Sequence, residues 1–359
     1  MAKRERLTRQ QRLHKEKLEL KLPSLPWYVD QYKDDMFSGN TSPSTLLGYF
    51  HDFEKFFQWL ITEGIADVST PKEISLKTLE ELKLTEANAF FTHLKYDLEL
   101  QDDSINRKKS SLKSLFKYLT ERTEDEEGEC YFYRNVMAKV KMHKVKEDLD
   151  VRADRISTKI LHGEEMLDFV AFIENDYVSS IDKQKLKKAY FKRDKERDLA
   201  IITLFLASGI RVSELANLTL NAVNLKKRKL NVLRKGSKES TVFFREFAVP
   251  YLEKYRDLRE TRYKALQDEK YYFLTKYRGS AQPLSVRSIQ ELIAKYTEAY
   301  RDERLYPHKM RHSFATEYAK HNTVYDLMRQ LGHSSTDTSS LYVNSSEDEA
   351  RNAIDKLEK

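Results

Sequence analysis

Cysteine is almost absent from this sequence of 359 residues, which contains a single one, Cys130. One thiol cannot form a disulfide within the chain, and the residues around Cys130 do not have the spacing of a metal site. An internal disulfide framework is therefore excluded, and the composition fits a reducing compartment. We expect a cytoplasmic protein without a metal or another cofactor.

Long hydrophobic runs are also scarce. The longest, Leu199–Ile210, is interrupted by Thr203, Ser208 and Gly209. It is too short to span a bilayer and predicts a buried core helix. Residues 1–22 are basic and polar and lack the apolar centre of a signal peptide, so we expect no membrane partner.

Acidic residues are fewer than basic ones, with 57 Asp and Glu against 64 Lys and Arg, and the net charge is +7. A basic balance favours a polyanionic partner, with nucleic acid as the first candidate. The alternative is a soluble protein that is merely rich in lysine, and charge alone does not choose between them. The chain is 40% hydrophobic, and its length suffices for two ordinary domains with cores.

Apolar residues at helical spacing predict a helical first half. We expect helices at residues 27–37, 44–63, 78–83, 85–98 and 104–122, with Gly64 as a natural C-cap. The preceding stretch, 1–22, has eight Lys and Arg against three Glu. This stretch is either a frayed basic helix that contacts DNA or a tail exposed to solvent, and both alternatives stay open.

The last of these helices carries a concentration of basic side chains. No acid interrupts the sequence from Ser104 to Thr120. The polar side chains that we expect to contact DNA phosphates are Asn106, Arg107, Lys108, Lys109, Lys113 and Lys117. The alternative is a solvated helix face.

Apolar residues thin out between 139 and 157, which predicts a linker long enough to let two domains wrap opposite sides of a duplex. The second half is mixed. We expect helices at 163–175, 194–208, 250–267, 285–300, 307–320 and 323–331, strands at 229–235 and 239–244 around the Gly236-Ser237 turn, and one short strand at 272–275. The expected divisions are a basic extension at 1–22, a helical domain at 23–143, a linker at 144–157, a mixed α+β domain at 158–345 and a C-terminal helix at 346–359.

Cleavage of a phosphodiester without a metal requires a nucleophilic side chain, cations for the phosphate charge and a general acid for the leaving oxygen. Arg211 follows the apolar helix at Gly209-Ile210, where it can project from a sharp junction; the alternative is an arginine paired with Glu214. Lys235 lies at the predicted hairpin tip, where it can reach a DNA groove and donate a proton. The alternative is an exposed turn lysine.

Histidines supply the remaining candidates. His308 and Arg311 are three residues apart and share one helix face, which begins after Pro307. His308 and His312 are four apart, which raises a metal site as an alternative, but no Glu follows His308 as in zinc proteases. His333 follows a Gly332 cap, and Tyr342 comes nine residues later.

Taken in order, these motifs resemble the tyrosine recombinase (phage integrase) family. The resemblance covers Gly-Ile-Arg-Val-Ser-Glu-Leu from Gly209, Lys-Gly-Ser-Lys-Glu from Lys235, His-Lys-Met-Arg-His from His308, Leu-Gly-His-Ser from Leu331, and Tyr342. Arg211 and Lys235 are 24 positions apart, and His333 and Tyr342 are nine apart, both as in Xer-type members. The first half, from Ser104 through Leu119, is similar to the core-binding domain of the family.

The resemblance implies a role for each residue. Tyr342 would be the nucleophile and form a 3′-phosphotyrosine, and Arg211 and Arg311 would hold the non-bridging oxygens. Lys235 would be the general acid, with Lys238 as a further DNA contact on the hairpin. His308 and His333 would assist proton transfer, and Glu214 would support the site without acting on the substrate. The fold implied is a two-domain C-shaped clamp, mainly α with a small β-hairpin or sheet.

The resemblance also implies partners. Members act as homotetramers on two double-stranded DNA sites, without metal or ATP. The Leu25-Pro26-Trp27-Tyr28-Val29 opening, the length and the long charged linker are similar to the single-recombinase Xer subfamily of streptococci and lactococci. That similarity implies chromosome-dimer resolution at a dif-like site with an FtsK-type translocase. The C-terminal helix would pack on a neighbouring protomer or on its own domain.

Three alternatives stay open. A phage or transposon integrase would use the same chemistry, although the roughly 22 residues ahead of Pro23 are too few for an added arm-binding domain. A type IB topoisomerase would also share the chemistry without paired sites. A non-catalytic DNA-binding protein would need the cations but not Tyr342.

Overall fold

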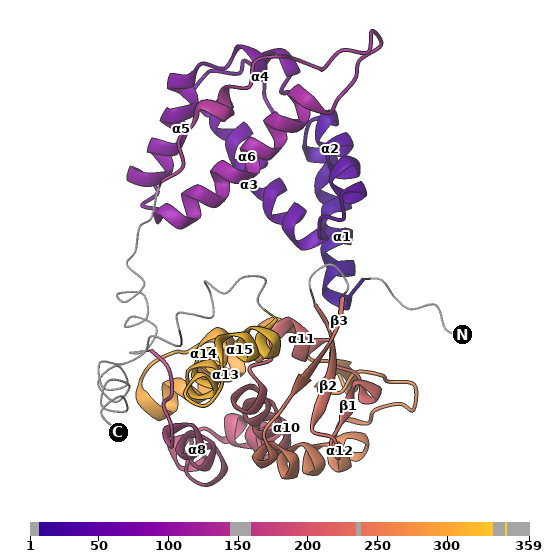
Figure 1. Ribbon diagram of the computed structural model, residues 1–359, viewed down its shortest axis with the longest axis vertical. Coiled ribbons are helices and arrows are strands. Elements are labelled where there is room, and N and C mark those ends of the chain that lie inside the picture. The colour runs from indigo at the N-terminus through magenta and orange to yellow at the C-terminus, as the bar shows by residue number, and fades with distance from the viewer. Residues whose placement is uncertain (1–6, 144–158, 235–237, 333–341, 343–359) are drawn as a thin grey trace, which may run out of the picture. The chain divides into compact units, whose positions relative to one another are not determined.

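The structure is a computed structural model that describes residues 7–143, 159–234, 238–332 and 342 (Figure 1). The chain divides into two compact units, Met1–Lys146 and Glu147–Lys359, and each has its own hydrophobic core. The division falls within the expected linker, which lies outside the described residues together with the expected C-terminal helix at 346–359. The exact domain boundaries and the clamp therefore stay predictions.

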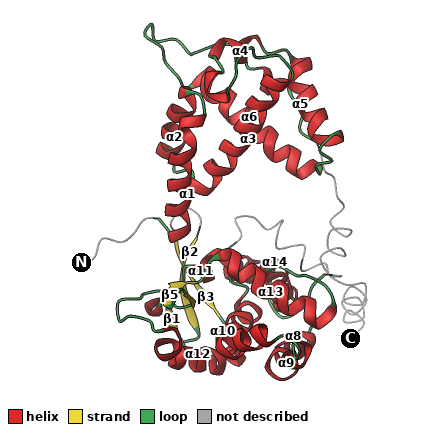
Figure 2. Ribbon diagram, turned by 180° about the vertical axis from the view of Figure 1, so that it is seen from behind, coloured by secondary structure: helices red, strands yellow, loops and turns green. Residues whose placement is uncertain are grey.

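Helices make up most of both units, and Figure 2 shows that the described strands belong to the C-terminal unit. The prediction of a mainly α fold with a small sheet is confirmed. Among the helices described, none combines the length and the apolar character that crossing a membrane requires.

The N-terminal unit is a helical bundle around an aromatic core. Its helices are α1 (Arg9–Lys21), α2 (Trp27–Ser38), α3 (Pro43–Thr62), α4 (Leu76–Glu81), α5 (Leu84–Tyr96) and α6 (Asp102–Glu121), with 3-10 turns at Leu22–Ser24, Pro71–Glu73 and Val136–Lys139. Helix α3 starts at a Ser42 cap whose hydroxyl accepts from the amide of Thr45, and it ends before Gly64, whose φ is +66°. It contributes four fully buried aromatic rings to the core, Phe50, Phe53, Phe56 and Phe57.

Helix α1 agrees with the helical one of the two alternatives left open for residues 1–22 and not with a solvated tail. Thr8 and Gln11 form a capping box that starts the helix, and Leu18 is fully buried in the core of the unit. The helix packs against α3, where Lys21 pairs with Glu54. The basic composition hid this packing, because one buried leucine does not produce a helical period.

The C-terminal unit surrounds one central helix. Its helices are α8 (Glu165–Ala171), α9 (Tyr177–Ser180), α10 (Lys185–Ser208), α11 (Val212–Ala216), α12 (Val249–Tyr263), α13 (Val286–Arg301), α14 (Pro307–Ala319) and α15 (Val324–Leu331), with a π-helical turn at Phe172–Asp176 and 3-10 turns at Leu220–Ala222 and Glu246–Ala248. Helix α10 packs against α12 and α14 and is buried on all sides from Arg197 to Ser208. This confirms the core helix predicted from the apolar run. The helix starts at Lys185 rather than at residue 194, and its additional first turns are rich in lysine and mostly exposed.

The strands form two small antiparallel sheets. The first has the order β1 (Val223–Asn224), β2 (Lys229–Arg234) and β3 (Lys238–Phe243), with Arg234 opposite Lys238 next to the hairpin tip. The second pairs β4 (Leu274–Tyr277) with β5 (Ser280–Pro283). The sequence predicted the β2–β3 hairpin but missed β1 and β5, because β1 has two residues and the four residues of β5 include a proline and no β-branched or aromatic side chain.

Candidate active site

Arg211 lies at the junction where α10 ends and α11 begins. Gly209 follows α10 with a φ of +63°, and this left-handed residue turns the chain so that Arg211 becomes the N-cap of α11. The guanidinium donates to Oε1 of Glu214 at 2.9 Å and to the carbonyl of Gly332 at 2.8 Å, and the amide of Arg211 donates to the other Glu214 oxygen at 3.0 Å. The pairing with Glu214 that the sequence offered as an alternative is thus present, and it holds the guanidinium of Arg211 in a fixed position.

Arg311 lies on α14 and is 4% exposed. Its guanidinium donates to the carbonyl of Gly209 at 2.6 Å and to that of Leu331 at 2.7 Å. Burial, followed by repulsion from Arg211, lowers the pKa of Arg311 to about 10, so the side chain stays charged at neutral pH.

The C-terminal end of α15 is the point where three arginines meet. Arg234, the last residue of β2, donates to the carbonyls of Arg329 at 3.2 Å and Gln330 at 2.7 Å. The carbonyl of Leu331 is bound by Arg311 and that of Gly332 by Arg211. Four successive carbonyls thus accept from arginines, as the negative end of a helix dipole favours. We call Arg211, Arg234 and Arg311 the arginine cluster.

The side chain of Gln330 ties the same helix end to two other elements. Its amide nitrogen donates to the carbonyl of Ser208 at 2.9 Å and to that of Phe243 at 2.7 Å, and its oxygen accepts from the amide of Phe243 at 3.3 Å. Together with Arg234, Gln330 fixes the β2–β3 hairpin against α15, so the hairpin and the arginine cluster form one assembly.

His308 and Tyr342 lie beside this assembly. Partial burial lowers the pKa of His308 below its ordinary value, and the cations Arg311, Arg211 and Lys309 lower it further. Tyr342 is 3% exposed and packs in a small cluster with apolar side chains of α14 and α15, among them Phe314 and Leu331. Leu331, which packs in the same cluster as Tyr342, also accepts a hydrogen bond from Arg311 through its carbonyl, and an ionised Tyr342 would raise the pKa of Arg311.

His312 is the residue whose role the sequence missed. Its Nδ1 is hydrogen-bonded to the hydroxyl of Tyr342, with the two ring centroids 5.4 Å apart. The centroid of the His308 ring is 5.4 Å from that of His312, on the same face of α14. The spacing of the two histidines suggested only a metal pair, and within the described parts of the chain no group of three or more His, Cys, Asp or Glu side chains could hold a metal.

Two expected residues are not placed, and a third is placed only by its backbone. Lys235 and His333 lie outside the described residues, directly after Arg234 and Gly332 respectively. Lys238 begins β3, opposite Arg234, but its side chain is not among those described. Lys235 directly follows Arg234, a member of the arginine cluster, and His333 directly follows Gly332, whose carbonyl accepts from Arg211.

Comparison with known proteins decides the family. The model of the phage integrase family matches residues 172–349, and that of the phage integrase N-terminal SAM-like domain matches residues 29–123. The chain is 40% identical to tyrosine recombinase XerS of Streptococcus sanguinis (strain SK36) over 344 residues, which are 93% of this chain and 96% of that protein. It is 40% identical to tyrosine recombinase XerS of Streptococcus uberis over 352 residues, or 95% and 98% of the two chains.

The chain belongs to the phage integrase family of tyrosine recombinases. It is a site-specific DNA recombinase. Its fold is similar to the crystal structure of the XerH site-specific recombinase bound to palindromic difH substrate, with a TM-score of 0.62, 19% identity and coverage of 89% of this chain and 82% of that one.

In this recombinase, α6 is not the continuous basic stripe that the sequence suggested. Lys108 is buried and its ammonium pairs with Asp52 on α3 at 2.7 Å, while the guanidinium of Arg107 holds both oxygens of the same carboxylate at 2.8 Å. Lys109 is buried too and donates to the carbonyl of Lys141 at 2.9 Å. The expectation of an exposed row is wrong for Lys108 and Lys109, because their charges serve packing within the unit.

The other three α6 residues are less enclosed. Asn106 exchanges hydrogen bonds with the backbone of His143 at 2.9 Å, and Lys113 reaches the carbonyl of Ala138 at 3.4 Å. Lys117 is exposed, with Glu121 at 3.7 Å. Of the six predicted contacts on α6, Arg107 and Lys117 are the two exposed residues.

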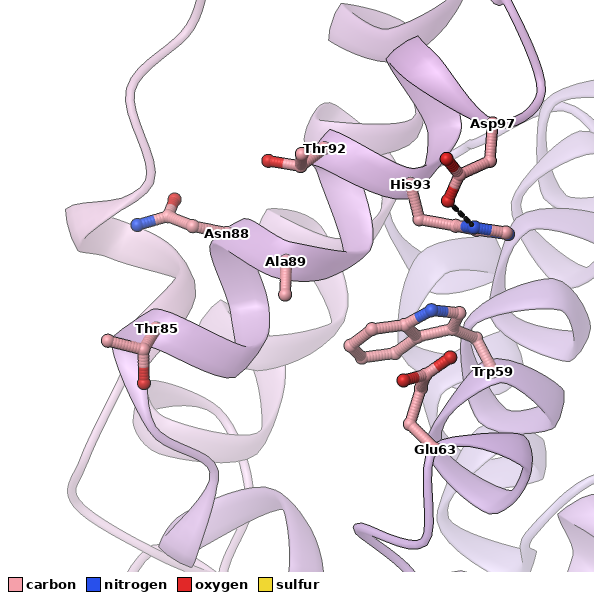
Figure 3. A pocket seen from close by; sticks show the side chains of 8 residues that line it. All are labelled: Trp59, Glu63, Thr85, Asn88, Ala89, Thr92, His93 and Asp97. Atoms are coloured by element: carbon pink, nitrogen blue, oxygen red, sulfur yellow. Dashed lines mark hydrogen bonds and ion pairs between the residues drawn. The ribbon is translucent and has the colours of Figure 1, made fainter.

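A pocket of ≈ 520 Å³ is formed by residues of the N-terminal unit alone, whereas the catalytic candidates belong to the C-terminal unit. It is lined by Trp59, Glu63, Thr85, Asn88, Ala89, Thr92, His93 and Asp97 (Figure 3). His93 and Asp97 bond to each other at 2.7 Å at its edge. The pocket contains none of the residues that the sequence singled out.

Proposed function

We propose that this recombinase cuts and rejoins DNA by attack of Tyr342 on a phosphodiester, with a 3′-phosphotyrosine intermediate. The observation that carries the proposal is the position of Tyr342, whose hydroxyl contacts His312 and whose phenol lies near Arg311. Transesterification without a metal needs a hydroxyl nucleophile beside fixed cations, because the charge of the phosphate must be neutralised as the new bond forms.

Arg211 and Arg311 are the groups that bind the non-bridging oxygens. Each is held by backbone carbonyls, and Arg211 also by Glu214, so neither has to search for its orientation when DNA arrives. Arginine suits this role because its planar fork of donors matches two phosphate oxygens. Glu214 thus acts through Arg211 and does not contact the substrate.

Lys235 is the general acid, and His308 and His333 assist by hydrogen bonding and proton transfer. The tyrosine oxygen forms a bond to phosphorus, the bond from phosphorus to the 5′ oxygen breaks, and Lys235 gives that oxygen its proton. The energy of the broken bond is kept in the phosphotyrosine linkage, so the 5′ hydroxyl of a new partner strand can rejoin without ATP. No cofactor takes part in this scheme.

The proposal is tested with a nicked suicide substrate. Cleavage releases a short strand that carries the free 5′ hydroxyl, and its diffusion prevents rejoining, so the covalent adduct accumulates. The wild type is expected to form a protein–DNA adduct that survives denaturation. Lys235→Ala is expected to form it about 100- to 10,000-fold more slowly, the usual contribution of a general acid. A 5′-thiol leaving group needs no acid, so it should restore the rate of Lys235→Ala. Absence of any adduct with the wild type would reject the proposed chemistry, and a lack of thiol rescue would reject the role of Lys235.

We further propose that the biological reaction is the resolution of chromosome dimers by a homotetramer on two double-stranded DNA sites, with an FtsK-type translocase as partner. Support comes from the similarity to XerS proteins over 93% of the chain. DNA contacts of the N-terminal unit would come from α6, with Arg107 and Lys117 the first candidates. The hairpin residue Lys238 would add a contact from the C-terminal unit.

Deletion of the gene is expected to leave a fraction of dividing cells with unseparated chromosomes. The defect should disappear in cells that cannot form dimers because homologous recombination is blocked, since dimers arise only from crossovers. Microscopy of stained nucleoids measures both effects. An integrase of a mobile element would give no such defect, and a normal deletion strain would therefore refute this part of the proposal.

A further inference from the structure

His312 is placed to act directly on the nucleophile. Its Nδ1 bonds to the hydroxyl of Tyr342, and the two rings lie 5.4 Å apart at an interplanar angle of 38°. The histidine is half-buried, and Tyr342 is enclosed by the α14–α15 cluster. The contact joins an imidazole nitrogen to the one tyrosine atom that must react.

A tyrosine nucleophile needs a proton acceptor at neutral pH. A phenol ordinarily ionises near pH 10, so almost all of it carries its proton at pH 7. The neutral hydroxyl is a weak nucleophile, and attack on phosphorus requires the proton to leave before or during bond formation. Lys235 donates a proton to the leaving 5′ oxygen, but neither of the two assisting histidines has been assigned to the phenolic proton, which still needs an acceptor.

The described polar groups of the site differ in their ability to accept this proton. The arginine cluster consists of groups that only donate. Glu214 is a base, but both of its oxygens accept from Arg211. His308 stands one helical turn from His312, and its bond to the phenol is not observed, whereas that of His312 is.

We propose that His312 is the proton acceptor for Tyr342, an inference that rests on the proposed role of Tyr342 as nucleophile. In the tautomer that carries its proton on Nε2, Nδ1 accepts from the phenol. As the tyrosine oxygen bonds to phosphorus, the phenolic proton moves to Nδ1 and the 5′ oxygen leaves with the proton of Lys235. In rejoining, the incoming 5′ hydroxyl gives its proton to Lys235, and His312 returns the stored proton to Tyr342.

The electrostatics of the site fit this transfer once DNA is bound. A protonated His312 would stand near Arg311, and the two positive charges repel each other. The phosphodiester brings a negative charge to the same place and offsets the repulsion. Proton acceptance by His312 is thereby favoured when a phosphate occupies the site, which restrains ionisation of the tyrosine in the free protein.

Two substitutions separate proton transfer from positioning. His312→Ala removes both functions, while His312→Asn keeps a side-chain group that can hydrogen-bond the phenol but cannot take up a proton. Both variants are expected to form the adduct about 100- to 10,000-fold more slowly than the wild type. His321→Ala, an exposed histidine just beyond α14, is the matched control and should cleave like the wild type.

A modified tyrosine or a modified substrate shows which of the two proton transfers, from the phenol or to the 5′ oxygen, a substitution has slowed. A fluorinated tyrosine at position 342 ionises more readily and needs less help from a base, so it should restore much of the rate in His312→Ala. It should not restore Lys235→Ala, whose defect is corrected by the 5′-thiol substrate. The thiol substrate in turn should leave the His312→Ala defect in place.

The outcomes are distinct. Fluorotyrosine rescue of a slow His312→Ala supports the proposal and also shows that the variant is folded. Wild-type rates in His312→Ala, or in His312→Asn, would overturn it, and so would rescue of His312→Ala by the thiol alone. If the wild type forms no adduct, the proposed function has failed rather than this inference.

Discussion

Tyr342→Phe is expected to abolish covalent adduct formation and to leave the protein folded. The ring of Tyr342 packs against Phe314 and Leu331, and phenylalanine keeps those contacts. The substitution removes the bond between the hydroxyl and His312, which costs about 1 kcal/mol of stability. Since phenylalanine has no nucleophilic oxygen, the loss of cleavage should be complete. A suicide substrate resolved on a denaturing gel measures the adduct.

The control for Tyr342→Phe is Tyr318→Phe, because Tyr318 packs against the same apolar cluster. That variant should form the adduct at the wild-type rate. DNA binding by Tyr342→Phe, measured by gel shift, should be close to that of the wild type, since the cations remain. An adduct that persists in Tyr342→Phe would show that another residue is the nucleophile.

Gly209→Ala is expected to destabilise the C-terminal unit by about 3 kcal/mol. A residue other than glycine at positive φ costs about 1 kcal/mol. In addition, a Cβ at Gly209 would stand 2.4 Å from Cδ1 of Phe314 and 2.8 Å from Cδ2 of Leu331, an overpacking that costs about 1–3 kcal/mol. Urea unfolding followed by circular dichroism measures the change in the transition of this unit.

Gly279→Ala provides the matched control in the same unit. Gly279 also has a positive φ, +86°, but no atom lies within 4 Å of the position of its Cβ. This variant should lose about 1 kcal/mol, from backbone strain alone. Because the carbonyl of Gly209 accepts from Arg311, Gly209→Ala should also slow cleavage, whereas Gly279→Ala should not. Equal losses of stability in the two variants would contradict the role assigned to packing at Gly209.

The sequence predicted the parts of the site that depend on local order. The apolar run that ends at Gly209 indicated a buried helix, and the turn after it indicated where Arg211 would project. Both features follow from residues adjacent in the chain, and the structure has them as expected. The pairing of Arg211 with Glu214, three residues away, was also visible for the same reason.

Contacts between distant segments could not be predicted in this way. Lys108 is neutralised by Asp52, which is 56 residues earlier in the chain, so a list of cations on α6 overstated its exposed charge. Arg234 binds carbonyls of α15 more than 90 residues later, and no local pattern marks it as part of the site. The sequence suggested His312 as a possible metal ligand but not as the partner of Tyr342, because this hydrogen bond joins residues that are 30 positions apart in the chain.

The arginine cluster at the end of α15 has a consequence for the thermodynamics of DNA binding. A free arginine side chain has rotamer entropy worth about 2 kcal/mol, which is lost when a phosphate immobilises it. In this recombinase, Arg211 and Arg311 are already immobilised by the carbonyls of Gly332, Gly209 and Leu331. That entropy is lost during folding, so more of the attraction between protein and phosphate is available to hold the DNA in the geometry of attack.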